Sequence, residues 1–303
     1  MSGKRALVTG ATGFVGKHLV RRLVRDGWQV SVLARTTSSI DTVSDIAEKV
    51  TAFRHDGSTG GMMDMVREAA PDVVFHLASL FLAQHTPEDV EGLVRSNVLF
   101  GTQLLEGMGA AGVTRLVNAG TAWQHYENSD YRPVCLYAAT KQAFEAMLEY
   151  YVDAFSVNAV TLKLYDTYGP EDTRRKLFAV LRENSLLGTP IDMSPGEQIM
   201  DVVYIDDIVE AFVTAAGLLM EGRLQGSRRY ALSSGAPLRL RDLVETYARV
   251  TGRELKVNWG SRPYRHREVM VPWDRGMPLP GWEPRINLES GIRLIEDICG
   301  GGG

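Results

Sequence analysis

Apolar runs that end in glycine or a polar residue alternate, in the first half of the chain, with segments whose apolar residues recur every three to four positions. The runs predict strands over residues 6–10, 29–35, 50–56, 71–79, 113–120 and 159–169. The periodic segments between them predict helices over residues 14–27, 62–69, 87–111 and 137–155. Continuous apolar runs separated by helices favour a parallel sheet covered on both faces and joined by right-handed crossovers. The fold class expected is therefore α/β, with a doubly wound parallel sheet.

The pattern changes beyond about residue 170, where short segments are punctuated by proline. Further helices are expected near residues 174–187, 206–220, 239–251 and 287–298. We expect residues 1–170 to form the sheet domain, with later segments returning to it. Residues 171–299 are expected to form a smaller mixed α/β lobe, and the GGGG of residues 300–303 a flexible tail.

The stretch TGATGFVG places Gly10, Gly13 and Gly16 three residues apart, between the first strand and the first helix. Gly10 permits a turn, Gly13 lets the backbone approach a ligand, and Gly16 lets the helix pack closely. A helix N-terminus carries unpaired N–H groups and partial positive charge, which suit a pyrophosphate. At the first strand of a βαβ pattern, the motif predicts a Rossmann-type dinucleotide site. The alternative is a glycine turn that only connects strand to helix.

The end of the second strand is where such a fold contacts the adenosine ribose. An acidic residue there favours NAD(H), whereas this chain has Arg35, followed by the hydroxyl residues Thr36, Thr37, Ser38 and Ser39. A guanidinium among hydroxyls suits a 2′-phosphate, so we favour NADP(H), with NAD(H) possible. Arg35 stacked on adenine or extended into solvent is nearly as good an interpretation. Asp56, after the third strand, either accepts from the adenine amino group or caps a turn.

The segment YAATK places Tyr137 and Lys141 four residues apart at the start of a helix, and therefore on one face. A phenol holds its proton to about pH 10, and a neighbouring ammonium lowers that pKa. The pair then serves as a proton donor and acceptor near neutrality. A pair on a helix surface is the common interpretation of this spacing. Its position after the fifth strand of a dinucleotide fold favours catalysis.

Composition limits the partners. The chain has 303 residues, 45% of them hydrophobic, and a formal net charge of −4, which is ordinary for a globular protein and argues against nucleic-acid binding. Two cysteines, far apart, favour a reduced, cytoplasmic setting. No Cys/His cluster has metal-ligand spacing, so no metal is expected. We expect no leader segment, because the N-terminus enters an apolar strand at once and no apolar region with a small-residue cleavage site follows. We expect no membrane partner, because no apolar stretch reaches spanning length.

The glycine motif and the Tyr137–Lys141 pair together resemble the extended short-chain dehydrogenase/reductase family, also called the NAD-dependent epimerase/dehydratase family. The resemblance covers nearly the whole chain. It includes HLAS (76–79), Asn97 on the central helix, VVYIDDIVEAF (202–212) and LPGWEPRINLESGI (279–292). It implies a catalytic trio of Thr121, Tyr137 and Lys141, with Thr121 after the fifth strand in NAGTAWQHY. The alternative role for Thr121 is a turn residue that bonds local backbone.

The resemblance also implies two sets of binding residues. The cofactor set comprises the glycine turn, strand ends and catalytic pair: Gly10, Thr12, Gly13, Phe14, Val15, Arg35, Asp56, Gly57, Leu77, Ala78, Ser79, Asn97, Tyr137, Lys141 and Leu164. The substrate set comprises Leu80, Ala122, Trp123, Asp166, Lys176, Arg182 and Arg262. An arginine frequent in the family is replaced by Met200, and Arg182, Arg262 and Arg265 are candidates to replace it or are surface charges. His125 contacts a sugar or is structural.

Sugar dehydratases of the family carry an Asp-Glu pair after the catalytic threonine, where this chain has Ala122 and Trp123. Neither moves a proton, which leaves reduction of a keto-sugar or 4-epimerisation. DTYGP (166–170) and the basic residues 174–176 resemble 4-ketoreductases that act on CDP- or dTDP-linked 4-keto-6-deoxyhexoses, such as paratose and abequose synthases. The predicted function is NADPH-dependent C4 reduction of such a nucleotide sugar.

Three other functions stay open: an NAD-dependent nucleotide-sugar 4-epimerase, a reductase of a non-sugar carbonyl, and a non-enzymatic, redox-sensing NADP-binding protein. Many relatives form homodimers through two long helices per subunit. The predicted helices near 87–111 and 137–155 suit that role, although burial within a monomer requires similar apolar faces.

Overall fold

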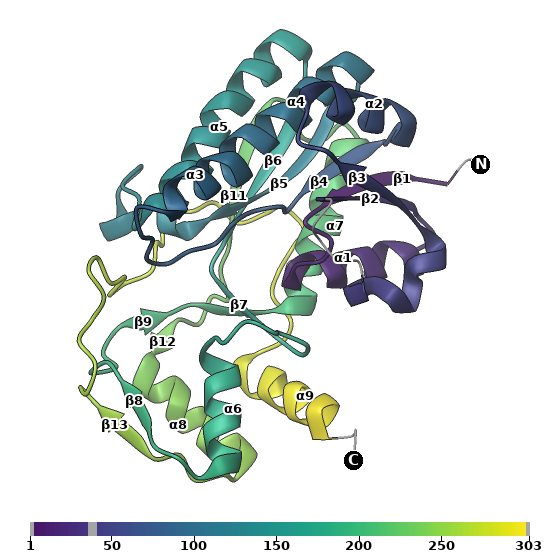
Figure 1. Ribbon diagram of the computed structural model, residues 1–303. Helices are drawn as coiled ribbons and strands as arrows, with labels where there is room; N and C mark the ends of the chain where they lie inside the picture. Colours follow the sequence, from purple (N-terminus) through teal and green to yellow (C-terminus); the bar gives the residue numbers. More distant parts are fainter. Residues whose placement is uncertain (1–2, 36–40, 301–303) are drawn as a thin grey trace.

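The computed structural model describes residues 3–35 and 41–300 (Figure 1). Its centre is a parallel sheet of seven described strands in the order β11-β6-β5-β4-β1-β2-β3. The strands are β1 (Arg5–Thr9), β2 (Gln29–Arg35), β3 (Val50–His55), β4 (Val73–His76), β5 (Arg115–Thr121), β6 (Asn158–Leu164) and β11 (Ser227–Leu232). Strand order reverses direction between β1 and β4, which opens a crevice at the carboxyl ends of these strands. The predicted Rossmann-type α/β class is confirmed.

Helices cover both faces of this sheet (Figure 1). On one face α1 (Phe14–Arg25) packs against α7 (Ile205–Met220). On the other, α4 (Phe100–Ala111) packs between α2 (Thr59–Ala69) and α5 (Leu136–Phe155). Successive residues of β1 serve different faces, since Leu7 belongs to the core under α4 and α5, and Val8 to the core under α1 and α7. This is why the strand sequences read as continuous apolar runs.

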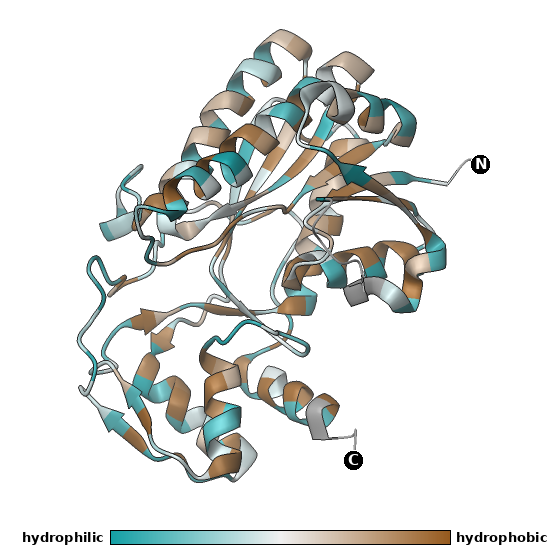
Figure 2. Ribbon diagram, in the orientation of Figure 1, coloured by the Kyte–Doolittle hydropathy of each residue, from teal (hydrophilic) through white to brown (hydrophobic). Residues whose placement is uncertain are grey.

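The second lobe lies below the sheet in Figure 1. Its helices are α6 (Leu177–Leu187), α8 (Leu240–Thr251) and α9 (Leu288–Gly300). Its short strands pair as β7 (Asp166–Tyr168) with β10 (Val202–Tyr204), β8 (Ile191–Met193) with β13 (Val257–Trp259), and β9 (Ile199–Met200) with β12 (Leu238–Arg239). Figure 2 shows alternating hydrophobic and hydrophilic stripes along α6 and α8, as expected for helices covering one face of a small core.

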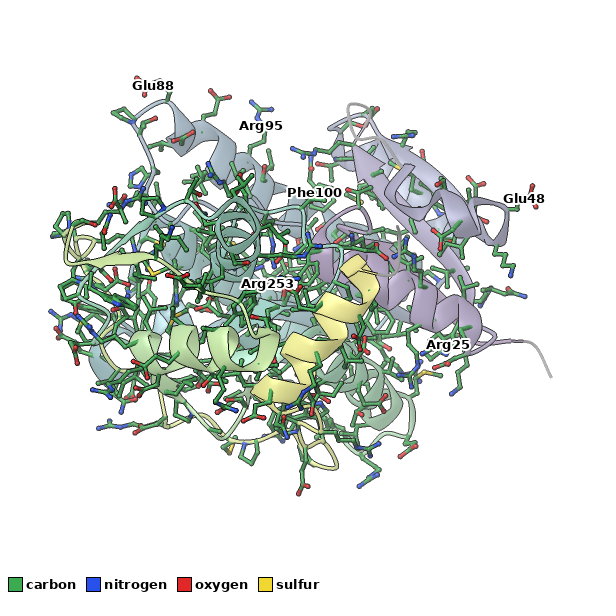
Figure 3. The ribbon with its side chains drawn as sticks, turned by 90° about the horizontal axis from the view of Figure 1, so that it is seen from below. Arg25, Glu48, Glu88, Arg95, Phe100 and Arg253 are labelled. Atoms are coloured by element: carbon green, nitrogen blue, oxygen red, sulfur yellow. The ribbon has the colours of Figure 1, made fainter. Side chains whose placement is uncertain are left out.

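Contacts between distant segments hold the lobe together. Arg253, labelled in Figure 3, lies beside α9, where its Nη1 is 2.5 Å from Glu296 Oε2. The Tyr247 hydroxyl of α8 donates to Glu296 Oε1 at 2.7 Å. Helix α9 continues through Gly300, so the first residue of the predicted tail is helical. Residues 301–303 lie outside the described residues.

Three predicted elements differ from the structure. The expected helix over 87–111 is divided into α3 (Asp89–Val94), a π-helical turn η2 (Arg95–Leu99) and α4. The expected strand over 159–169 breaks at Tyr165, because β7 leaves the main sheet to pair with β10. The helix expected from residue 174 begins at Leu177, because Arg174 is held in the preceding loop by Asp172.

Three 3₁₀ segments complete the described elements: η1 (Asp41–Lys49), η3 (Ala122–Gln124) and η4 (Tyr126–Asn128). Of these, η1 links β2 to β3 and packs against α1. Across residues 3–35 and 41–300, no helix combines the length and apolar character needed to cross a bilayer.

Candidate active site

Three adjoining cavities run from the carboxyl ends of the sheet strands into the second lobe. The first, about 480 Å³, is lined by the glycine turn and the ends of β2 and β3. The middle cavity, about 240 Å³, adjoins it at Gly10, Gly13, Leu77 and Ser79. The lobe cavity, about 800 Å³, adjoins the middle one at Phe81, Trp123, Asp166, Thr167 and Lys176. Together they form one cleft from the sheet domain into the second lobe.

The glycine turn forms part of the wall of the first two cavities. Gly10 has φ +71°, and a Cβ on it would lie 2.6 Å from the backbone nitrogen of Ala78. A Cβ on Gly16 would lie 2.0 Å from the Gly10 carbonyl oxygen, so this glycine lets α1 pack against the turn itself. Gly13 is the N-cap residue of α1, where the described residues provide no side-chain capping hydrogen bond, and it lines both cavities. An uncapped helix start on a cavity wall suits an anionic group.

The outer end of the first cavity holds the predicted adenosine-side residues. Arg35 is exposed at the end of β2, and it lines this cavity with Asp56. Asp56 Oδ1 accepts from the backbone N–H and the hydroxyl of Ser58, both at 2.8 Å, and these bonds lower the Asp56 pKa. The turn-capping role of Asp56 is therefore realised. The predicted hydroxyl residues 36–39 lie outside the described residues. Thr12, Gly57 and Ala78, which were predicted on the cofactor side, line this cavity.

Asn97 lies in the π-helical turn and is 1% exposed. Its Oδ1 accepts from the Leu80 N–H at 2.7 Å, and its Nδ2 donates to the Leu80 carbonyl at 3.0 Å and to Thr140 Oγ1 at 2.9 Å. It therefore holds the loop after β4 against α5 and shapes the cofactor side indirectly. Leu80, predicted on the substrate side, lines the first cavity instead.

The predicted catalytic trio meets in the middle cavity, whose wall includes Thr121, Tyr137, Lys141 and Leu164. Tyr137 is the second residue of α5, and Lys141, 2% exposed, follows one turn later. Thr121 ends β5, and its Oγ1 accepts from the Trp123 N–H at 3.2 Å. This local bond, the alternative considered from sequence, uses an acceptor site and leaves the hydroxyl proton for another partner.

Burial governs the acidity of the pair. Burial raises the pKa of Tyr137, while Ser79 and the charge of Arg174 lower it. Burial lowers the pKa of Lys141 to about 8, with Glu145 raising it and Lys163 lowering it. The expectation that the Tyr137 pKa is lowered is wrong, because desolvation of the phenolate outweighs the hydrogen bond with Ser79 and the positive charge of Arg174.

The lobe cavity collects most predicted substrate-side residues. Lys176 Nζ lies 3.5 Å from Asp166 Oδ1, and Arg182 Nε lies 3.8 Å from Glu296 Oε2. Lys176, Asp166, Arg182 and Trp123 line this cavity. Ala122 lines an adjacent cavity of about 80 Å³, together with His125, whose ring stacks on Trp273.

Arg262, which was predicted on the substrate side, is not among the described residues that line the lobe cavity. It is exposed beside β8, where its N–H donates to the Met193 carbonyl at 3.1 Å. Arg265 reaches the cavity instead, with its guanidinium 5.5 Å from the Trp123 ring centroid. Met200, at the position of the family's frequent arginine, also lines the cavity.

Phe81 is a site residue that the sequence did not reveal. It lines both the middle and the lobe cavity, with its ring centroid 5.0 Å from that of Tyr137 and 5.6 Å from that of Trp123. Lys176 Nζ lies 5.2 Å from the Phe81 ring centroid. The available sequence signal was the position of Phe81 directly after HLASL (76–80), a segment already expected beside the cofactor.

Arg174 also faces the middle cavity. Its guanidinium carbon lies 4.5 Å from the Phe14 ring centroid, and its Nε and Nη2 donate to the Asp172 carboxylate at 2.6 and 2.7 Å.

Within the described ranges, no cluster of three or more His, Cys, Asp or Glu side chains is arranged to hold a metal ion.

A family model described as the NAD dependent epimerase/dehydratase family matches residues 6–224. The chain belongs to this family. The CDP-abequose synthase of Salmonella muenchen is 26% identical over 295 residues, covering 96% of this chain and 97% of that one. The UDP-glucose 4-epimerase of Mycolicibacterium smegmatis is 28% identical over 307 residues, covering 95% and 96%.

Solved structures agree with this membership. The Thermus thermophilus UDP-glucose 4-epimerase, in complex with NAD, has a TM-score of 0.83 at 27% identity and covers 99% of this chain and 100% of that one. The complex of MoeE5 with UDP-glucuronic acid and NAD has a TM-score of 0.84 at 25% identity, covering 98% and 99%. Family membership supports an oxidoreductase-type enzyme, and the uncapped start of α1 on the wall of the first cavity suits the pyrophosphate of a dinucleotide.

Proposed function

We propose that this protein reduces the C4 keto group of a nucleoside diphosphate-4-keto-6-deoxyhexose with NADPH. The observation that carries the proposal is the meeting of Thr121, Tyr137 and Lys141 in the cavity between the glycine turn and the lobe cavity. A carbonyl that enters from the lobe side reaches these groups opposite the cofactor side. The similarity to CDP-abequose synthases and UDP-sugar epimerases supports a nucleotide sugar as substrate.

The dinucleotide would be held by the start of α1, Arg35 and the wall residues Leu77 and Ser79. When bound, NADPH supplies a hydride to a carbonyl carbon. Tyr137 donates the proton to the carbonyl oxygen, and Thr121 donates a hydrogen bond to the same atom. That bond strengthens as negative charge builds on the oxygen, which is where stabilisation raises the rate. Lys141 supplies positive charge beside both groups.

Substitutions at the strand end support reduction over dehydration. Elimination of water needs an additional acid and base near the sugar, and Ala122 and Trp123 supply neither. Asp166 stands where common epimerases have asparagine, and its carboxylate is paired with Lys176. Arg35 favours a 2′-phosphate, as expected for an enzyme that consumes NADPH. In the lobe cavity, Lys176, Arg182 and Arg265 offer positive charge to a diphosphate.

A second candidate is an NAD-dependent nucleotide-sugar 4-epimerase. The similarity to UDP-glucose 4-epimerases favours it, and the same trio serves oxidation followed by reduction. Both reactions fit a reduced, cytoplasmic setting.

We also propose a homodimer, formed through the outer faces of α3 and α5. Exposed apolar side chains lie on these faces: Val90, Val94, Met147 and Tyr150.

The test mixes the purified protein with NADPH or NADH and a panel of CDP- and dTDP-linked 4-keto-6-deoxyhexoses. A reductase consumes the reduced nicotinamide in proportion to product, faster with NADPH. An epimerase interconverts UDP- or CDP-hexoses without net oxidation of added NADPH, which would replace the first proposal by the second. A carbonyl reductase acting only on non-sugar substrates would contradict both.

A further inference from the structure

A buried polar cluster lies beneath the end of β5. It is formed by Gln124, Glu145 and Lys163, which are 0%, 1% and 1% exposed. Lys163 Nζ donates to Glu145 Oε1 at 2.7 Å, to Glu145 Oε2 at 2.9 Å and to Gln124 Oε1 at 2.8 Å. Gln124 Nε2 donates to Glu145 Oε1 at 2.9 Å and to Gln142 Oε1 at 2.7 Å. Every polar atom of the Gln124 amide is therefore bonded.

Gln124 also bonds the catalytic strand end. Its Oε1 accepts from the Thr121 backbone N–H at 3.2 Å, which forms a capping box with the Thr121 hydroxyl. One side chain thus joins the strand that carries Thr121 to the helix that carries Tyr137 and Lys141. Glu145 and Gln142 are the α5 ends of this connection.

Glu145 continues the face of α5 on which the catalytic pair lies, because Tyr137, Lys141 and Glu145 are each four residues apart. The charged and titratable groups acting on or beside Lys141 are Glu145, Lys163, Tyr137 and His76. His76 is fully buried, with its pKa lowered to about 3, so it is neutral. Glu145 raises the Lys141 pKa and Lys163 lowers it, so the two partners of this ion pair act on Lys141 in opposite directions. Arg229 Nε also lies 3.2 Å from Glu145 Oε2.

We propose that Gln124 is a positioning residue for the reaction, fixing Thr121 relative to Tyr137 through the Glu145–Lys163 ion pair. The inference rests on the proposed roles of the trio and holds equally for a reductase and an epimerase. A catalytic hydrogen bond loses its effect when the donor is misplaced by even 1 Å, which costs on the order of 100-fold in rate. A purely structural cluster needs no bond to Thr121, and an apolar side chain would fill the same buried space.

The main test compares Gln124→Met with Gln142→Met. The first variant keeps the side-chain length and removes every amide hydrogen bond, including that to Thr121. The second removes only the outer partner of Gln124. We expect Gln124→Met to lower kcat by on the order of 10–100-fold with the Kd of NADPH unchanged. Gln142→Met should stay within about twofold of the wild type. Equal kcat values for the two variants, or a loss confined to cofactor affinity, would overturn the proposal.

Two further measurements extend the test, and the first of them needs no substrate. Amide hydrogen exchange across residues 121–124 should accelerate in Gln124→Met and stay unchanged in Gln142→Met; unchanged exchange in both would overturn the role. In Glu145→Gln, the high-pH limb of kcat/KM should move to lower pH, because Glu145 raises the Lys141 pKa. If that variant does not fold, because Lys163 and Arg229 lose their carboxylate partner, the comparison of Gln124→Met with Gln142→Met decides the proposal. Absence of turnover in the wild type would refute the proposed function, and the exchange experiment would still decide the positioning role.

Discussion

Lys17, on the first helix of the sheet domain, is bound to Glu171, in the loop that lines the lobe cavity. Its ammonium donates to the Glu171 carbonyl at 2.6 Å and lies 3.1 Å from Oε2 of the carboxylate. Arg21 bonds the same carboxylate at 2.8 Å and also pairs with Asp45. Glu171 thus joins the lobe loop to α1 and, through Arg21, to η1.

Glu171→Gln tests this connection. Its hydrogen bonds with Arg21 and Lys17 lower the Glu171 pKa to about 2. A carboxyl whose folded pKa lies below its unfolded value of 4.5 stabilises the fold above that value and loses the effect as pH falls toward 2. We expect Glu171→Gln to lower the Tm at pH 7, to lower it less near pH 3, and to have its smallest effect near pH 2, where the carboxyl becomes protonated in the folded state. Glu91→Gln, in an exposed pair with Arg95, is the matched control and should change little.

Tyr137→Phe removes the proposed proton donor and keeps the ring that packs against Phe81. We expect turnover to fall by on the order of 10²–10⁴-fold with the Kd of NADPH unchanged. Single-turnover kinetics and fluorescence titration measure the two quantities. Tyr150→Phe, an exposed tyrosine on the same helix, is the control. Normal turnover in Tyr137→Phe would remove the tyrosine from the mechanism.

If Lys141 acts as proposed, its charge is expected to set an upper limit on the pH at which the enzyme works. Because burial lowers its pKa to about 8, the side chain is mostly protonated at pH 7 and loses its charge as pH rises through 8. We therefore expect kcat/KM to be flat below about pH 7 and to fall above pH 8, as measured from pH 6 to 10. A profile that stays flat to pH 10 would mean that the Lys141 charge does not contribute. Lys141→Met should abolish the limb together with most activity.

Arg35 tests cofactor choice. Arg35→Glu places a carboxylate where the 2′-phosphate is expected, so the preference for NADPH over NADH should fall by about tenfold or more. The ratio of kcat/KM values for the two cofactors measures the change. Arg67→Glu, the same charge change in an exposed pair with Asp64 on α2, is the control. An unchanged ratio in Arg35→Glu would assign Arg35 to solvent or to stacking on adenine.

The proposed dimer face is tested by Val94→Asp and Tyr150→Asp. These side chains are 45% and 61% exposed on α3 and α5, which contact each other along one outer face (Figure 1). A charge buried in an apolar interface should convert the dimer to a monomer in light scattering. Val271→Asp, 58% exposed on the C-terminal segment, should leave the assembly unchanged. A monomeric wild type at micromolar concentration would contradict the proposal.

Local sequence was sufficient for the sheet and the glycine turn, because those elements depend on neighbouring residues and on burial of whole strands. The π-helical turn was not predictable in this way. It is associated with Asn97, whose hydrogen bonds reach Leu80 and Thr140, 17 and 43 residues away. Helical periodicity alone therefore gave one continuous helix.

The same reasoning separates the site residues. The catalytic trio lies in regular elements, with Thr121 at the end of β5 and with Tyr137 and Lys141 at the start of α5. In such elements the spacing along the sequence predicts which side chains lie on the same side, and the trio lines one cavity. Arg262 and Arg265 lie in an irregular segment, and nothing in their spacing indicated which would face the cavity. The direction of the Tyr137 pKa shift was also missed, because sequence shows the neighbouring ammonium and not the desolvation around the phenol.

The late addition of β11 beside β6 has a consequence for how the chain matures. On a ribosome, residues 1–170 emerge with the outer edge of β6 uncovered and the α1 face lacking α7. Such an intermediate presents an unpaired backbone edge to other nascent chains. A truncated product that ends near residue 170 is therefore expected to aggregate.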